Sequence, residues 1–295
     1  MHISLTGVQI FLDHLSGKLP LAEVLEHEAY RTIFAHSRQF GDGLSEADVR
    51  RALEGGESPY YGLRNLMPHL PAISRLMQTI QDEGDQWVQL AETELKRLLP
   101  REDLDDILIY PTIGYDAGIG LDGVVCMNLN FPPYLADANE FLYTLIHEVF
   151  HVVYARIHVV PNVNRLSTSR HWLSFFALML QNEGYAVYAP LRLRAERGHL
   201  GNRSHPILAD YVVLSDPAEM EEHLSAFRQL LQLLNSDPLN RDEYLERIFG
   251  PQRLTYRVGC ELVRRIELEH GLEAVQEAVY LSGAEFLRTY RHLLS

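Results

Sequence analysis

Apolar positions recur at helical spacing through the first hundred residues. In the segments 19–40 and 70–100 they stand three or four residues apart, which places them on one face of a helix. The segment 45–55 begins with a serine, a typical N-cap residue, and ends with a glycine. We therefore predict that residues 1–101 are mostly helical, with a long last helix that is weakened near Gly84 and ended by Pro100.

A different pattern occupies residues 106–133. This stretch is rich in β-branched residues, is interrupted by glycines and closes with two prolines, which indicates strand, turn and strand. It is the only part of the chain that predicts strands well. Residues 118–123 match the G-x-G-x-x-G pattern of dinucleotide-binding proteins, but that motif needs a helix to begin there, and a strand-like run follows instead. We interpret these glycines as turn residues of a β-hairpin.

Helical patterns return after residue 136. The segment 137–158 begins with Asp137 and Glu140 at the spacing of a capping box. The segment 168–189 ends before Pro190, and the pattern is helical again from residue 198 onward. The chain is thus predicted to be an α+β protein, predominantly α-helical, in three segments: residues 1–101, 102–199 and 200–295.

Composition narrows the classes of partner. The formal net charge is −14 and no basic stripe runs along the chain, so nucleic acid and anionic membrane surfaces are not expected as partners. Cys126 and Cys260 are far apart and lack metal-binding spacing, which favours a reduced compartment. The first residues lack the pattern of a secretory signal, and no segment approaches the roughly 18 apolar residues that span a bilayer. We expect a soluble, cytoplasmic protein.

Three polar residues interrupt the apolar segment 144–156. In a helix, His147 and His151 lie one turn apart on the same face, and Glu148 lies beside them, about 100° around the axis. Two imidazoles in this arrangement bind one metal ion at Zn–N distances of about 2.0–2.1 Å. The neighbouring carboxylate can then act as general base on the metal-bound water. Burying these groups without such a partner would cost several kcal/mol.

Glu183 is the candidate third ligand. It stands in the equally apolar segment 168–189, and antiparallel pairing of the two helices would bring it near the histidines. Gly184 lacks a Cβ atom, so we expect the two helices to approach closely there. Two histidines, one glutamate and an open position for water are typical of a catalytic zinc site. A buried polar network without metal is the alternative.

These residues resemble the gluzincins, metallopeptidases with H-E-x-x-H on one helix and a glutamate ligand on a following helix. The first motif is present at residues 147–151. The second, at residues 183–186, has the E-G-x-A form of bacterial peptidases in the MA-like clan. The resemblance covers residues 106–190 and implies a zincin-like core within residues 102–199.

The resemblance also implies a role for each residue of the two motifs. Zinc would be bound by His147, His151 and Glu183. Glu148 would activate a water for hydrolysis of a peptide bond and pass its proton to the leaving amine. The strand 123–130 would be the edge strand beside the active-site helix, where an extended peptide adds by β-pairing.

The oxyanion of a tetrahedral intermediate needs a donor besides zinc. Tyr256, near the start of a late helix, is the candidate, and a tyrosine packed at a helix start is the equally open alternative. Further candidates are Tyr185, His171 and His205. His158 lies about 10 Å along the helix from His151 and is not expected to be a ligand.

Two other functions stay open. The pairs Glu148/His151 and Glu267/His270 have the three-residue spacing of di-iron carboxylate proteins, with Glu183 as an extra ligand. Alternatively, the chain is a non-catalytic zincin-like protein with a binding or regulatory role. We favour zinc-dependent peptide hydrolysis, with a peptide or protein as substrate.

Overall fold

The computed structural model describes residues 1–236 and 241–294. These residues form mostly helices and one four-stranded mixed sheet, which confirms the α+β prediction. The chain divides into two compact units. Unit 1 contains residues 1–93, 102–156 and 162–164, and unit 2 contains residues 94–101, 157–161 and 165 onward. The three-segment division of the sequence stays a prediction.

Unit 1 holds the helices predicted near the N-terminus. The helices assigned here are α1 (Thr6–Leu15), α2 (Leu21–Glu26), α3 (Glu28–Phe40), α4 (Glu46–Leu53), most of α5 (Leu66–Leu98), α6 (Pro132–Ala136) and α7 (Asn139–Ile157). The helix predicted over 19–40 is interrupted at His27, whose extended backbone ends α2. The imidazole of His27 then caps α3, because its Nδ1 accepts a hydrogen bond from the backbone N–H of Ala29.

Helix α5 runs through Gly84 without a break, so the expected weakening there is wrong. Gly84 is buried, and a Cβ atom on it would lie 3.5 Å from Cδ1 of Ile3. Tertiary packing of this kind outweighs the low helix propensity of one glycine. The helix ends before Pro100, as predicted.

The sheet of unit 1 is mixed. Its strands are β1 (His2–Ile3), β2 (Leu108–Thr112), β3 (Gly118–Leu121) and β4 (Val124–Asn128), in the order β1-β2-β4-β3. The neighbours β1 and β2, and β2 and β4, are parallel, whereas β3 and β4 are antiparallel. β1 was not predicted, because a strand of two residues is too short to show an alternation of apolar and polar positions.

The position of β4 corrects one prediction. The segment 123–130 was expected to be the edge strand, but β4 lies between β2 and β3. The strand at this edge of the sheet is β3. The error arises because the pairing of β2 with β4 is non-local, and periodicity within one strand carries no information about which strands flank it.

The predicted hairpin joins β3 to β4. At its turn, Asp122 and Gly123 have positive φ values of 49° and 84°, as a type I′ turn requires at both central positions. Gly118 and Gly120, however, lie within β3 and not in the turn. The interpretation of all these glycines as turn residues is therefore wrong for two of them.

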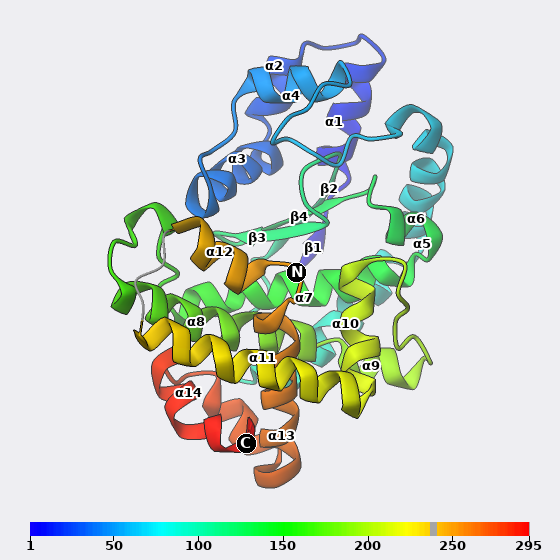
Figure 1. The fold of residues 1–295 in the computed structure, drawn as a ribbon. Helices are drawn as coiled ribbons and strands as arrows, with labels where there is room; N and C mark the ends of the chain where they lie inside the picture. Colours follow the sequence, from blue (N-terminus) through cyan, green and yellow to red (C-terminus); the bar gives the residue numbers. More distant parts are fainter. Residues whose placement is uncertain (237–240, 295) are drawn as a thin grey trace. The chain divides into compact units, whose positions relative to one another are not determined.

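Helices cover both faces of the sheet in unit 1 (Figure 1). On one face, the thiol of Cys126 in β4 donates to the carbonyl of Ala29 in α3. Ile119 of β3 pairs with Cys126, so both side chains point to this face. Because side chains alternate along a strand, Gly118 and Gly120 belong to the opposite face. A Cβ atom on Gly120 would come within 2.5 Å of the carbonyl oxygen of Glu148, so this second face packs directly on α7.

The described residues of unit 2 form helices and the loops between them, and no strand. Its helices are α8 (Ser169–Tyr188), α9 (Leu191–Glu196), α10 (Pro206–Ser215), α11 (Pro217–Ser236), α12 (Arg241–Phe249), α13 (Leu254–Ala278), α14 (Gly283–Tyr290) and the 3-10 helix η2 (Arg291–Leu294). A further 3-10 turn, η1 (Val163–Arg165), begins in unit 1 and ends in unit 2. The helices predicted over 168–189 and after residue 198 are confirmed. Helix α13 is kinked at Gly271, whose φ is 84°.

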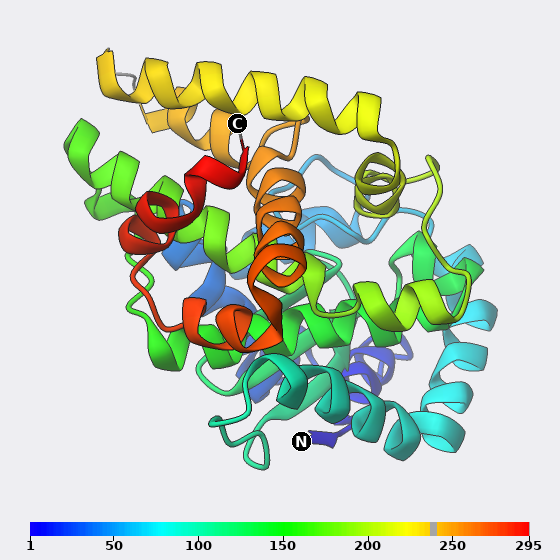
Figure 2. The same cartoon turned by 90° about the horizontal axis from the view of Figure 1, so that it is seen from below.

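Helices α8 and α13 cross in close contact within unit 2 (Figure 2). At the crossing, a Cβ atom on Gly184 would lie 2.4 Å from the carbonyl carbon of Gly259. We expected Gly184 to permit a close approach of α8 to the helix that carries the histidines. The atoms nearest to a Cβ atom on Gly184 belong instead to Gly259, so Gly184 permits a close approach of α8 to α13.

None of the described helices combines the length and the apolar character that a membrane crossing needs.

Candidate metal centre

His147 and His151 project from one face of α7. Their Nε2 atoms are 3.0 Å apart, and the two rings are nearly perpendicular. Two nitrogen ligands on a tetrahedral zinc ion, with Zn–N bonds of about 2.05 Å, are separated by about 3.3 Å. Helical spacing alone therefore brings both Nε2 atoms to a separation that suits a shared metal ion.

Glu148 is buried on the same helix, with only 7% of the residue exposed. It faces β3, where a Cβ atom on Gly118 would lie 2.6 Å from Cγ and 3.0 Å from Oε1 of Glu148. Gly118 and Gly120 thus make room for this turn of α7. We did not anticipate this role, although two glycines on the same face of a strand are a sequence signal for close approach of another backbone.

Glu183 lies in α8 and is also buried, with 8% exposed. Among the residues that the structure describes, His147, His151 and Glu183 form a group in which each side chain offers one ligand atom that could hold a metal ion. All three residues were singled out from the sequence.

Tyr256 lies in the first turn of α13 and is half-buried. The guanidinium of Arg253 lies over its ring, 3.7 Å from the ring centre. Arg253 directly precedes α13, in a left-handed backbone conformation with φ 47° and ψ 44°. We did not predict a role for Arg253.

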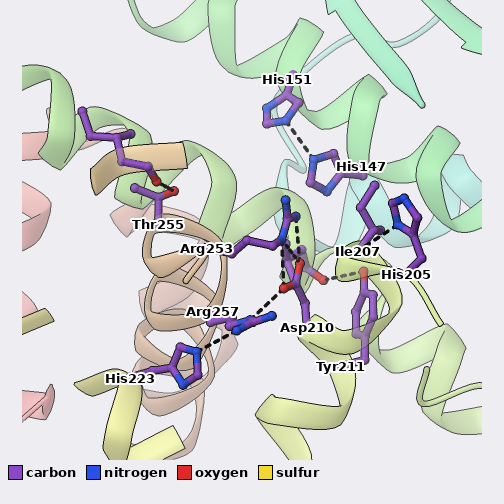
Figure 3. Close-up of polar contacts among 12 residues, drawn as sticks. His147, His151, His205, Ile207, Asp210, Tyr211, His223, Arg253, Thr255 and Arg257 are labelled. Atoms are coloured by element: carbon purple, nitrogen blue, oxygen red, sulfur yellow. Dashed lines mark hydrogen bonds and ion pairs between the residues drawn. The ribbon is translucent and has the colours of Figure 1, made fainter. Parts of the chain in front are cut away.

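Asp210 of α10 connects two arginines (Figure 3). Its carboxylate accepts hydrogen bonds from Nε of Arg253 at 2.8 and 3.0 Å and from Nε of Arg257 at 2.8 Å. Arg257 also donates to Nε2 of His223, whose Nδ1 lies 2.8 Å from the carbonyl oxygen of Glu219. Because an arginine is only a donor and a carbonyl only an acceptor, His223 is neutral with its proton on Nδ1.

The family comparison agrees with this chemistry. A family model described as "Putative zinc dependent peptidase (DUF5700)" matches residues 21–294. The chain belongs to this family. A search of the curated proteins and a search of the solved structures each gave no match.

The other candidate donors to the oxyanion in this member of the zinc-dependent peptidase family are Tyr185, His205 and His171. The hydroxyl of Tyr185 is buried and donates to the carbonyl of Val275 at 2.7 Å. His205 caps α10 by accepting from the backbone N–H of Ile207, and His171 is exposed in the first turn of α8. His158, which was not expected to be a ligand, lies 2.7 Å from the carbonyl oxygen of Val279. These contacts give Tyr185, His205 and His158 structural roles.

Glu267 and His270, the second residue pair of the di-iron alternative, both lie in unit 2. Glu267 forms an ion pair with Arg97 at 2.9 Å and a hydrogen bond with the hydroxyl of Tyr188. His270 is exposed, directly before the kink at Gly271. The zinc family and these contacts together favour a zinc site over a di-iron site.

The two cysteines of this zinc-dependent peptidase family member are both buried and free. Burial, followed by the nearby Glu148 carboxylate, raises the pKa of Cys126 above its ordinary value. Burial and the neighbouring Glu261 likewise raise the pKa of Cys260. Metal ligation requires a thiolate, so neither thiol is suited to bind zinc.

Proposed function

We propose that the protein hydrolyses peptide bonds with a zinc-activated water, in the manner of a gluzincin. The observation that carries the proposal is the pair of Nε2 atoms 3.0 Å apart on α7, with the buried carboxylate of Glu148 between them in the sequence. Membership of a family of zinc-dependent peptidases supports the same reaction.

In this proposal, His147, His151 and Glu183 hold the zinc ion and leave one position open to water. Two neutral imidazoles and one carboxylate are a donor set that zinc prefers in catalytic sites. Zinc bound there would supply Lewis acidity and lower the pKa of the water. Glu148 accepts the proton of that water and delivers it to the leaving amine.

The substrate is held as an extended peptide along β3. This strand lies at an edge of the sheet, and its glycines lie against Glu148. A peptide that adds to β3 would therefore run beside the general base, with its backbone aligned by hydrogen bonds. Together, α7 and the antiparallel edge strand support a zincin-like core, with β3 taking the role first expected of β4.

Tyr256 is the proposed donor to the oxyanion. Its supporting observation is its position in unit 2. There Gly184, next to Glu183, lies against Gly259, three residues after Tyr256, so that neither position has room for a Cβ atom. A phenol hydroxyl can donate to the developing charge without changing its protonation state.

Metal analysis of the purified protein followed by a peptide-library cleavage assay tests the proposal. We expect about one zinc ion per chain, cleavage of peptides by the zinc-loaded protein, and loss of cleavage when a chelator is present. Less than half an equivalent of zinc after zinc is supplied would contradict the metal site. One equivalent of zinc without any cleavage would favour the non-catalytic zincin-like alternative, and bound iron would favour the di-iron one.

A further inference from the structure

The side chain of Arg253 is held in one orientation. Nε and Nη2 of its guanidinium both contact the carboxylate of Asp210, at distances between 2.8 and 3.0 Å. Asp210 is buried, with 1% of the residue exposed. A guanidinium that binds a buried carboxylate through two nitrogens has little freedom to rotate.

The backbone and a neighbouring ring add to this constraint. Arg253 adopts the left-handed backbone conformation, with φ 47°, which is unfavourable for residues other than glycine. Such conformations persist where the surrounding structure requires them, and they are frequent at functional sites. The ring of Tyr256, 3.7 Å from the guanidinium carbon, restricts the plane of the group.

One nitrogen of this fixed group is available to a ligand. Within the described part of the chain, Nη1 of Arg253 donates no hydrogen bond, and the side chain is 15% exposed. Arg257 shares Asp210 but is differently placed, because its Nη1 donates to His223. Of the two arginines on Asp210, Arg253 has the more exposed side chain, 15% against 10% for Arg257.

The charges around Asp210 do not balance. One carboxylate contacts two guanidinium groups, and His223 is neutral, so the cluster of Asp210, Arg253 and Arg257 has a net charge of about +1. Burial acts to lower the pKa of Arg253, but Asp210, Tyr256 and Glu183 together outweigh it and raise that pKa. Arg253 is therefore always charged, and the carboxylate of Glu183 lies within its electrostatic range.

Helix packing explains why Arg253 lies near the candidate ligand Glu183. The contact of Gly184 with Gly259 brings one turn of α8 directly against the first turns of α13. Glu183 precedes Gly184, and Arg253 and Tyr256 precede Gly259 on α13. A side chain larger than hydrogen at either glycine would separate these residues.

We propose that Arg253 is a substrate-binding residue whose Nη1 donates to a negatively charged oxygen of the peptide, with Asp210 as its positioning residue. The inference rests on the proposed function, because Glu183 is there a zinc ligand and the substrate reacts beside it. A charged oxygen can have two sources in a peptide: the carbonyl oxygen of the bond under attack, which becomes an oxyanion when water adds to it, and a free terminal carboxylate. Both are recognised by the same guanidinium chemistry.

The test compares R253Q with a matched control, R264Q. Arg264 shares the buried carboxylate of Glu261 with Arg265, as Arg253 shares Asp210 with Arg257, so each variant leaves one arginine on the carboxylate. We expect R253Q to keep one zinc per chain and to lose about 100-fold in kcat/KM, the loss that follows removal of one donor to an oxyanion. R264Q should keep the zinc content and the activity of wild type. R253K should recover only part of the loss, because an ammonium group lacks the planar fork.

The best library peptide is assayed with a C-terminal acid and with a C-terminal amide. A fall in kcat on both peptides assigns the oxygen to the carbonyl under attack. A rise in KM confined to the acid assigns it to the terminal carboxylate. The inference would be overturned if R253Q were as active as wild type, or if R264Q lost as much activity as R253Q.

Titration of the zinc-loaded protein with inorganic phosphate separates this inference from the proposed function. We expect phosphate affinity to fall about tenfold in R253Q and to be unchanged in R264Q. If no peptide is cleaved but phosphate binding depends on Arg253, the peptidase proposal fails and the anion site stands. If R253Q binds phosphate as tightly as wild type, or if wild type binds none, the anion site is overturned even in an active peptidase.

Discussion

Glu148 is a charged residue in a buried position. Its carboxylate lies between α7 and β3, where Gly118 provides the space that a side chain would otherwise occupy. A buried carboxylate keeps one orientation, and the low local polarity strengthens its interaction with a nearby cation. These properties suit a general base that acts on a water held by a metal ion.

Replacement of Glu148 by glutamine tests its role as the base. The amide has nearly the same shape but cannot accept the proton, so E148Q should lose at least about 100-fold in kcat. Because Glu148 is not a proposed ligand, zinc content should stay near one per chain. Equal peptide cleavage by E148Q and wild type would exclude Glu148 as the base.

Replacement of Gly118 by alanine tests the space beside the base. The new Cβ atom would lie 2.6 Å from Cγ of Glu148, so the carboxylate must move. A displacement of about 1 Å at a reacting group lowers kcat/KM by about 100-fold, and we expect this loss in a peptide-cleavage assay with the zinc content unchanged. G84A is the control, because a Cβ atom at Gly84 meets only an ordinary contact at 3.5 Å. An active G118A variant would show that Glu148 tolerates the shift.

The main helix contact of unit 2 is built on two glycines. Gly184 of α8 and Gly259 of α13 touch through their backbones, which is possible only because neither has a Cβ atom. This contact determines which turns of the two helices face one another. The position of Arg253 and Tyr256 relative to Glu183 follows from it.

The G259A variant should separate α8 from α13. A Cβ atom there would lie 2.2 Å from the carbonyl oxygen of Leu180, and overpacking of this kind costs about 1–3 kcal/mol in the free energy of unfolding. Urea denaturation should show a lower midpoint, whereas G84A should be neutral or more stable by up to about 1 kcal/mol. An unchanged midpoint for G259A would mean that the helices adapt at no cost.

His27 makes the stability of α3 dependent on pH. Burial, with a smaller contribution from Arg31 and against the effect of Glu28, lowers the pKa of His27 below its ordinary value of 6.5. The neutral ring caps α3 through Nδ1, and protonation removes that acceptor. Since the folded pKa lies below the unfolded one, the contribution to stability is present above about pH 6.5 and is lost as the pH falls through the folded pKa.

Urea midpoints between pH 5 and pH 7.5 measure this dependence. The H27N variant retains a side-chain oxygen that caps a helix and does not titrate. Its midpoint should therefore fall less than that of wild type as the pH is lowered. Parallel curves for the two proteins would show that His27 does not contribute.

At the scale of the whole molecule, metal binding and folding are coupled. The proposed zinc ligands are assembled by the native fold and not in the unfolded chain, so zinc that binds them would stabilise the native state by mass action. We expect zinc at 100 times its dissociation constant to add about 2.7 kcal/mol to the free energy of unfolding. Chelator treatment should lower the melting temperature and zinc should restore it.

The H147A variant provides the control for this prediction. It lacks one proposed ligand, so zinc should raise its melting temperature much less than that of wild type. Equal responses of H147A and wild type to zinc would place the stabilising ion somewhere else in the protein.

Local sequence was sufficient to predict several features of this protein. The helix that carries His147, Glu148 and His151, its convergent imidazoles and the hairpin turn at Asp122 and Gly123 all depend on residues only a few positions apart. The interval of 3.6 residues per turn determines such geometry without help from the rest of the chain. Glu183 was singled out as a candidate ligand because a carboxylate in an apolar helix requires a partner, and its role as a ligand stays a prediction.

Tertiary structure alone decided the features that join distant segments. The interior position of β4, the strand β1, the contact of Gly184 with Gly259 and the bond of Asp210 to Arg253 each link residues far apart in the sequence. Periodicity shows which face of an element is apolar, but many elements could cover that face with similar burial of surface. The choice among them depends on the packing of the complete fold, where individual glycines and one buried carboxylate determine which segments meet.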